Sequence, residues 1–211
     1  MLKKLILEGQ IPYFKQIRKI LLLLAIITPL SVFFYPKEEA LFAQIGWDML
    51  IGVMLIRPIA DIIPKIKLFR TLVLLRKEFG IAACLFIIAH FVGFLMMQDQ
   101  SILSAITNPD YWGFYNVCGW GTWGLAFAMP VLLTSNIFSI ITLKKWWKYI
   151  QKLAYPFFIL GGVHVVMIEG GEGLWPIIVV AVLWIAAWIK KASKTPVRSS
   201  DEKTPVFPHI C

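Results

Sequence analysis

The sequence predicts an all-α integral membrane protein, a bundle of six transmembrane helices with both chain termini in the cytoplasm. Three observations support this fold class. The 211 residues are 59% hydrophobic and 16% charged, whereas soluble domains are about 45–50% apolar and about 25% charged. The apolar residues form blocks close to the roughly 20 residues that a helix needs to cross a bilayer. The charged residues between these blocks alternate in sign along the chain.

The first part of the chain contains two predicted spans. Residues 1–16 form a basic cytoplasmic N-terminus, and the transmembrane domain covers 17–189. The first apolar block, 17–35, is too long for the core of a signal peptide, and no small-residue cleavage site follows it. The second block, 40–63, is interrupted by charged residues and a proline but is long enough to span the membrane. A loop rich in Lys and Arg follows it.

Four further spans complete the predicted bundle. A polar, acidic link at 98–115 separates the first two of them and has room for a short surface helix. A basic link precedes the fifth predicted span. A tight acidic turn joins the fifth span to the sixth. We expect the tail 190–211, which is polar and contains Ser and Pro, to be a cytoplasmic segment that is disordered for most of its length. The predicted spans are 78–97, 116–141, 149–168 and 174–189.

The distribution of Lys and Arg sets the predicted orientation. Nineteen of the 21 lie in the N-terminus, the second and fourth links and the tail, and the exceptions are Lys37 and Arg57. The other three links carry six acidic residues and one Lys. This alternation follows the positive-inside rule for six spans that begin and end in the cytoplasm. Topology therefore explains the net charge of +9, which does not indicate a nucleic-acid partner.

Two histidines lie deep inside apolar spans, where a titratable side chain is costly and normally faces protein, water or a ligand. His90 lies about 12 residues into the third span and His164 about 15 residues into the fifth. Both spans run outward, so at 1.5 Å per residue the two side chains lie within about one turn of the same depth. We expect the remaining histidine, His209 in the tail, to be solvated.

The residues around these histidines suit a flat macrocycle held between two helices. Each histidine has a glycine one turn away on its own face, and phenylalanines flank His90 at i−4 and i+4. Haem iron takes axial histidines. The expected pocket lining is Phe86, Gly93, Phe94 and Gly161. From the residues alone an alternative stays open, in which both histidines hydrogen-bond neighbouring helices. Asp48 is a candidate to orient a histidine ring, or to make a polar contact with another helix.

Two motifs resemble a known family. RKEFG at 76–80 is followed ten residues later by His90, and Trp147 with QKLAY at 151–155 precedes His164. This pattern resembles the ferric-reductase-like transmembrane family, in particular the haem-binding subunits of periplasmic methionine-sulfoxide reductase systems. The resemblance covers roughly residues 40–190, with six spans and a similar chain length.

The resemblance implies a b-type cytochrome in a bacterial inner membrane. One haem would lie between the third and fifth helices, with His90 and His164 as axial ligands. Electrons would flow from a cytoplasmic flavin donor or a membrane quinol to a periplasmic reductase that carries a molybdenum cofactor. Binding of flavin mononucleotide (FMN) is also associated with the family. The role is that of an electron-transfer subunit, and no catalytic residue is predicted.

One departure from the family pattern limits the expected number of haems. Gln151 stands where the family has a histidine, and the position 13 residues before His90 is Lys77. Neither residue is a usual haem ligand, so we expect a single haem in the outer half of the membrane. A flavin or quinone could occupy the inner half, where Arg57, Arg76, Lys77 and Gln151 are candidate contacts for a phosphate or a head group. For Arg57 the simpler interpretation is an ion pair with Asp61 at i+4.

The sequence also bears on functions other than that of a b-type cytochrome. The chain lacks a Gly-rich nucleotide-binding fingerprint after the last span, which argues against a self-contained NADPH oxidase. The three cysteines form neither CxxC nor CxxCH, which excludes a thiol redox motif and c-type haem attachment. A stand-alone ferric or cupric reductase would share the haem and differ in its acceptor. A haem-free transporter or assembly factor would use the histidines for helix contacts or proton transfer.

Overall fold

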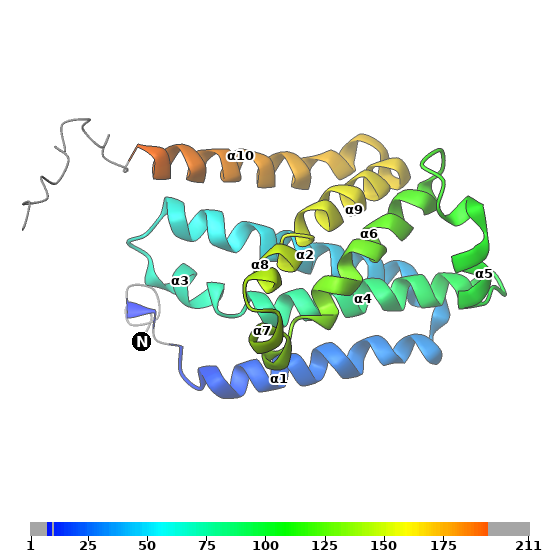
Figure 1. Cartoon of the computed structure of the whole chain (residues 1–211), viewed down its shortest axis with the longest axis horizontal. Helices are drawn as coiled ribbons and strands as arrows, with labels where there is room; N and C mark the ends of the chain where they lie inside the picture. Colours follow the sequence, from blue (N-terminus) through cyan, green and yellow to red (C-terminus); the bar gives the residue numbers. More distant parts are fainter. Residues whose placement is uncertain (1–7, 10, 194–211) are drawn as a thin grey trace, which may run out of the picture.

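The computed structural model describes residues 8, 9 and 11–193 (Figure 1). The expectation of disorder in the tail therefore falls, from residue 194 onward, outside the described residues. All regular structure in the described part is helical. In chain order the elements are α1 (Phe14–Ile27), η2 (Thr28–Phe33), η3 (Pro36–Glu38), α2 (Glu39–Ile62), α3 (Lys67–Val73), α4 (Arg76–Met97), α5 (Ile102–Thr107), η4 (Pro109–Tyr111), α6 (Val117–Leu133), α7 (Ile137–Leu143), α8 (Lys145–Gln151), α9 (Ala154–Glu169), η5 (Gly170–Gly173) and α10 (Leu174–Ala192).

The predicted all-α membrane architecture is confirmed. Five helical segments of the described chain are long and apolar enough to cross a membrane, and α6 with α7 makes a sixth if this bent pair counts as one span. The first span is α1 continued by η2, and the fifth is α8 continued by α9. The short surface helix expected between the third and fourth spans is α5. The basic link after the second span contains α3, which the hydrophobic pattern did not indicate.

The predicted fourth span, 116–141, is not one continuous helix. α6 ends at Leu133, and the axis turns by 89° before α7 begins. Polar residues cause this break, because the hydroxyl groups of the two residues after Leu133 hydrogen-bond back to carbonyls in the last turn of α6. The side chain of Asn136 then accepts a 2.8 Å hydrogen bond from the Ser139 amide, so it caps a new helix in a new direction.

Four helices form two packed pairs. α2 packs along α4 and α6 packs along α9, while α1 lies on α4 and α10 lies on α2. In Figure 1 the helices α1, α2, α4 and α10 follow the long axis of the molecule, and α6 and α9 cross them obliquely. A glycine permits the closest approach within the first pair, because a Cβ at Gly46 would lie 2.8 Å from the side chain of Ile87.

A buried core in the middle of the bundle joins the two pairs. Trp47 of α2 stacks on Phe158 of α9, with ring centroids 5.2 Å apart and an interplanar angle of 12°. Residues of α4, α6 and α10 pack into the same cluster. This core separates two regions that we name by their side chains. The histidine half contains His90 and His164, and the arginine half contains Arg57, Arg76, Lys77 and Gln151.

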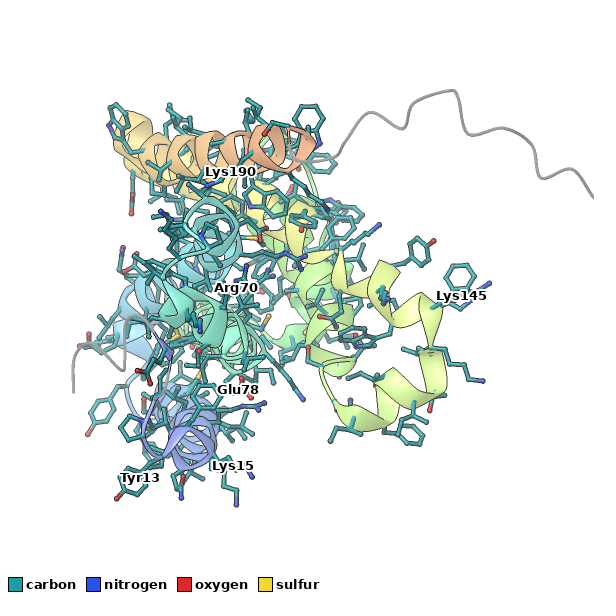
Figure 2. All side chains as sticks on the ribbon, turned by 90° about the vertical axis from the view of Figure 1, so that its left-hand side faces the viewer. Tyr13, Lys15, Arg70, Glu78, Lys145 and Lys190 are labelled. Atoms are coloured by element: carbon teal, nitrogen blue, oxygen red, sulfur yellow. The ribbon has the colours of Figure 1, made fainter. Side chains whose placement is uncertain are left out.

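Basic side chains gather at the end of the arginine half. Figure 2 looks along the bundle from this end and labels Lys15, Arg70 and Lys190, while α7 and α8, with Lys145, project sideways. Glu78 also belongs to this half, where its carboxylate ties α4 to the N-terminal helix α1. The gathering of cations at one end is what the positive-inside rule requires, and the cytoplasmic position of that end stays a prediction.

Candidate functional site

A cavity of about 380 Å³ lies between the α2–α4 and α6–α9 pairs, in the histidine half. Its volume falls within the roughly 300–1,000 Å³ that is usual for small-molecule sites. The walls are mostly apolar, and the ionisable side chains on them are those of two glutamates, two histidines, a tyrosine and a cysteine: Glu39, Glu169, His90, His164, Tyr111 and Cys118. The two histidines selected from the sequence therefore face one cavity, one from each helix pair.

The two imidazole rings stand at the spacing that one metal ion between them requires. Their centroids are 6.4 Å apart, and their planes are inclined at 56°. A metal–imidazole bond is about 2.0–2.1 Å and the bonded nitrogen lies about 1.2 Å from the ring centre, so two rings on opposite sides of one ion have centroids about 6.4–6.6 Å apart. The centroid spacing that α4 and α9 set is therefore compatible with both rings binding one metal ion between them.

The Nδ1 atom of each ring is already engaged. His164 Nδ1 lies 2.8 Å from the carbonyl oxygen of Val117, the first residue of α6. His90 Nδ1 lies 3.1 Å from the carbonyl oxygen of Glu39, the first residue of α2, and also contacts the Glu39 carboxylate. All these partners are acceptors, so each Nδ1 donates its N–H, and the free lone pair of a neutral ring lies on Nε2. That tautomer is the one that can bind a metal.

Glu39 was missed by reasoning from the sequence, which proposed Asp48 as the carboxylate beside a histidine. Asp48 instead accepts two hydrogen bonds of 3.2 Å from Gln44, one turn away on the same helix. Glu39 is 51 residues from His90 in the chain and lies at the start of a helix, so no local spacing indicates the contact. The one available signal was its position in an acidic link on the same predicted side of the membrane.

Close approach of α6 holds the second histidine in place. A Cβ at Gly121 would lie 3.0 Å from both Nδ1 and Cε1 of His164, so a side chain there would push against the ring. Gly161 of α9 lines the same cavity, one turn from His164. Small residues at these two positions therefore leave space beside the imidazole for a flat ligand.

The four residues expected to line the pocket divide into two groups. Phe94 and Gly161 line the cavity, whereas Phe86 and Gly93 do not. Helix geometry explains the correction: at about 100° per residue, i−4 and i+3 both turn to one flank of His90, and i+4 turns to the other. Phe86 faces α1, where it is buried in a second core cluster and borders a separate cavity of about 160 Å³.

The floor of the cavity separates it from the arginine half. Trp47, Leu50 and Phe157 line the cavity and belong to the central core. Each of these three side chains is less than 10% exposed. The cavity is therefore closed toward the arginine half by tightly packed apolar groups.

The four residues predicted to contact a flavin or quinone in the inner half of the membrane do not line this cavity. Arg57 and Asp61 form the i,i+4 ion pair expected from the sequence, but at 3.9 Å and with both side chains about 60% exposed it contributes little. Arg76 interacts electrostatically with Tyr155 and with Arg57, and its Nε atom is buried without a hydrogen-bond partner among the described residues. Lys77 is exposed.

Gln151 closes the end of α6. Its amide nitrogen donates to the carbonyl oxygen of Val131 at 3.3 Å and to the hydroxyl oxygen of Thr134 at 3.0 Å. Trp147, one turn earlier, donates to the Thr134 carbonyl at 2.9 Å. These bonds satisfy polar groups that the broken fourth span leaves without helical partners. Gln151 thus has a structural task in this chain, at the position where the family pattern has a histidine.

The donor set of the cavity selects the kind of metal group that fits. Among the described residues, no cluster of three or more His, Cys, Asp or Glu side chains could hold a metal ion. Two imidazoles alone are too few for a zinc site, which takes three or four protein ligands. Haem iron already has four porphyrin nitrogens and lacks only its axial ligands. The residues present therefore fit a haem.

The sequence is similar to one known protein family and to two of its named relatives. Residues 40–162 match the family described as "Ferric reductase like transmembrane component". Two similar relatives are each named "Protein-methionine-sulfoxide reductase heme-binding subunit MsrQ". The protein from Agrobacterium fabrum (strain C58) is 28% identical over 130 residues, which cover 62% of this chain and 57% of the relative. The protein from Rhizobium meliloti (strain 1021) is 28% identical over 116 residues, which cover 54% and 52%. The aligned part thus spans little more than half of these relatives, and no solved structure matches.

Proposed function

Since this chain belongs to the ferric-reductase-like transmembrane family, we propose that it is a multi-pass b-type cytochrome that transfers electrons across a bacterial inner membrane. A single haem would lie in the cavity of the histidine half, with His90 and His164 as its axial ligands. The observation that carries the proposal is the facing pair of rings, 6.4 Å between centroids, with both Nδ1 atoms bonded to acceptors.

The chain's own residues supply the ligands and their environment. A bound haem contributes a one-electron iron couple whose potential the protein sets. His90 and His164 present their Nε2 lone pairs from two separate helix pairs. Val117 and Glu39 hold the rings in that tautomer, and the mostly apolar walls suit the faces of a flat apolar ligand. The spacing of the two rings suits one metal ion between them.

The proposed acceptor is a periplasmic reductase with a molybdenum cofactor that reduces methionine sulfoxide. Support comes from the relatives, which are named as haem-binding subunits of such a system. The lining of the cavity includes Tyr111 and Glu169, which belong to the links that the positive-inside rule assigns to the periplasmic side. A partner docked on that face would be close to the two histidines.

The proposed donor is a cytoplasmic flavin reductase or a membrane quinol, which would act on the arginine half. Arg57, Arg76, Lys77 and Gln151 remain the proposed contacts for an FMN phosphate or a quinone head group. The buried Nε of Arg76, without a partner among the described residues, supports a role for that side chain. The case for Gln151 as a ligand contact is the weakest of the four, because its amide nitrogen already donates hydrogen bonds to Val131 and Thr134.

The first experiment is a visible spectrum of the detergent-purified chain, oxidised and then reduced with dithionite. We expect a Soret band, a resolved α-band on reduction and one haem per chain. His90→Ala and His164→Ala should each lose the bound haem, because one axial ligand is removed and the cavity has no other imidazole. His209→Ala is the matched control, since it removes the remaining histidine of the chain and should leave the spectrum unchanged.

The same spectra separate the alternatives. A chain that stays colourless after haem is supplied contradicts the cytochrome and favours a haem-free transporter or assembly factor. A haem protein that reduces external ferric or cupric chelates, with no partner protein present, is a stand-alone metal reductase. Retention of haem in both histidine variants means that the ligands lie elsewhere.

A further inference from the structure

We propose that Glu39 is a positioning residue that makes the two axial histidines unequal and lowers the reduction potential of the haem, and that Gly93 allows it to reach His90. This inference rests on the proposed function, because it concerns the potential of a haem bound by His90 and His164. It assigns roles to two residues that lie outside the ligand set.

Both acceptor groups of Glu39 converge on one nitrogen. The carbonyl oxygen lies 3.1 Å from His90 Nδ1, and the carboxylate Oε2 atom contacts the same Nδ1. Because Glu39 begins α2, the helix fixes its backbone while its side chain folds back over the ring. The N–H of His90 therefore bonds to a neutral carbonyl oxygen, and a carboxylate oxygen lies in contact with the same nitrogen.

Burial keeps this carboxylate from other partners. The side chains of His90 and Glu39 are 24% and 25% exposed. The Oε2 atom itself is buried and has no hydrogen-bond partner among the described residues, so its contact with His90 is the close one. A negative charge in such a place interacts strongly with its one neighbour, because little water screens it.

Gly93 explains how the start of α2 comes so near to α4. A Cβ at Gly93 would lie 2.8 Å from Cβ of Glu39, 3.0 Å from a methyl group of Val32 and 3.2 Å from the carbonyl oxygen of Pro36. The sequence suggested that this glycine makes room for the haem edge. The structure gives it a different neighbour, the corner between η3 and α2 that carries Glu39.

No carboxylate among the described side chains contacts the second histidine, on which the Glu39 charge acts only at longer range. His164 Nδ1 donates to the neutral carbonyl of Val117 at 2.8 Å. A carboxylate on the distal N–H of a ligating imidazole makes the ring a stronger donor to the metal, and outer partners of this kind typically change metal affinity by about 10–100-fold. Stronger donation favours ferric over ferrous iron, so Glu39 should lower the potential chiefly through the histidine that it contacts, His90.

The test compares three variants of the full-length haem-loaded chain in detergent by spectroelectrochemical titration. Glu39→Gln keeps the size and removes the charge. Gly93→Ala keeps the carboxylate but pushes it away from the ring. Glu38→Gln is the control, because it removes the same charge one residue away, from an exposed side chain. Low-spin ferric EPR spectra of each variant report on the axial ligands independently of activity.

We expect Glu39→Gln to weaken the preference for ferric over ferrous iron about tenfold, which for a one-electron couple raises the potential by about 59 mV. Gly93→Ala should shift the potential in the same direction by a smaller amount, and the EPR g-values should move in both. Glu38→Gln should match the wild type. Equal potentials in Glu39→Gln and Glu38→Gln, with haem bound in both, would overturn the proposal.

Two further outcomes are decisive. If Glu39→Gln loses its haem, the reduction potential of Gly93→Ala is compared with that of the wild type instead. An unchanged potential in Gly93→Ala contradicts the proposal. If the wild type itself binds no haem, the proposed function fails before any variant is compared. The two failures are therefore told apart by the wild-type spectrum.

Discussion

The histidine half and the arginine half of this bundle are built from the same helices but differ in what their polar side chains contact. In the histidine half, two imidazoles face a cavity of about 380 Å³, and their Nδ1 atoms bond outward to Glu39 and Val117. In the arginine half, the principal polar groups bond to neighbouring helices. Glu78 pairs with Arg18 of α1, and Gln151 bonds to the end of α6.

The difference supports the proposal of one haem rather than two. The described chain contains the histidines His90 and His164, and both are in the same half. The packed floor of Trp47, Leu50 and Phe157 closes their cavity toward the other half. Polar residues in the arginine half instead hold α1, α6 and α8 in place. We therefore expect substitutions in the histidine half to change haem binding, and substitutions in the arginine half to change stability.

The largest effect should come from closing the histidine half at Gly121. Gly121→Val places a branched side chain where even a Cβ would lie 3.0 Å from the His164 ring. The ring must move, so it loses its bond to Val117 and its aim toward His90. We expect haem content to fall at least tenfold, the scale of effect seen when the orientation of a ligand is lost. Haem per chain is measured by the pyridine haemochrome assay.

Gly52→Val is the matched control for this substitution. Gly52 also lies inside a membrane-spanning helix, and a Cβ there would meet no atom within 4 Å. The cost of a β-branched residue in a helix is therefore the same in both variants, and only Gly121→Val adds a clash. Equal haem contents in the two variants would mean that contact between α6 and His164 is unimportant.

Much of the fold could be predicted from the sequence, because a membrane imposes length and charge rules that act on each segment separately. The positions of the second, third and sixth spans follow from these rules. The break after Leu133 did not, since it depends on side chains that bond back to the helix and on the cap at Asn136. Hydropathy averaged over a span does not register three polar residues in a row.

The site likewise has features that follow from the spacing of residues along one helix and others that depend on contacts between distant segments. Matched depth was enough to predict that His90 and His164 face each other. It was not enough to predict which flank of α4 faces the cavity, and Phe86 and Gly93, which were predicted to line a haem pocket, are not among the residues that line this cavity. Glu39 was missed because its contact with His90 joins residues 51 positions apart. Local periodicity indicates a helix face, whereas the neighbours of that face depend on packing.

The second largest expected effect is a loss of stability when the buried carboxylate of the arginine half, Glu78, loses its partner. Glu78 is 6% exposed and accepts hydrogen bonds from Arg18 Nε at 2.8 Å and Nη2 at 2.5 Å. Arg18→Ala leaves this carboxylate without its partner, which should cost about 2–3 kcal/mol. For a chain of this length that corresponds to a fall in melting temperature of about 4–12 °C.

The double variant Arg18→Ala/Glu78→Gln tests the cause of this loss. A neutral amide in place of the unpaired carboxylate should recover part of the melting temperature, because the interaction between the two residues appears as non-additivity. Haem per chain should stay near the wild-type value in the folded protein throughout. A loss of haem in Arg18→Ala, without loss of stability, would contradict the separation of the two halves.

The smallest effect tests the position at which this chain departs from the family pattern. Gln151→Ala removes the amide that donates to Val131 and Thr134, and the loss of such hydrogen bonds should cost about 1 kcal/mol, or about 2–4 °C in melting temperature. Lys148→Ala, on the exposed side of the same short helix, should cost less.

Gln151→His then asks whether the missing family histidine would suffice for a second haem. We expect one haem per chain, as in the wild type, because one new imidazole would have no second histidine opposite it within the arginine half. Lys77, which stands at the corresponding position before His90, is exposed and is a cation. A stoichiometry of two haems in Gln151→His would show that the arginine half already holds a second ligand. The histidine half and the arginine half would then differ in haem binding because of the one residue at position 151, and not because their helices are arranged differently.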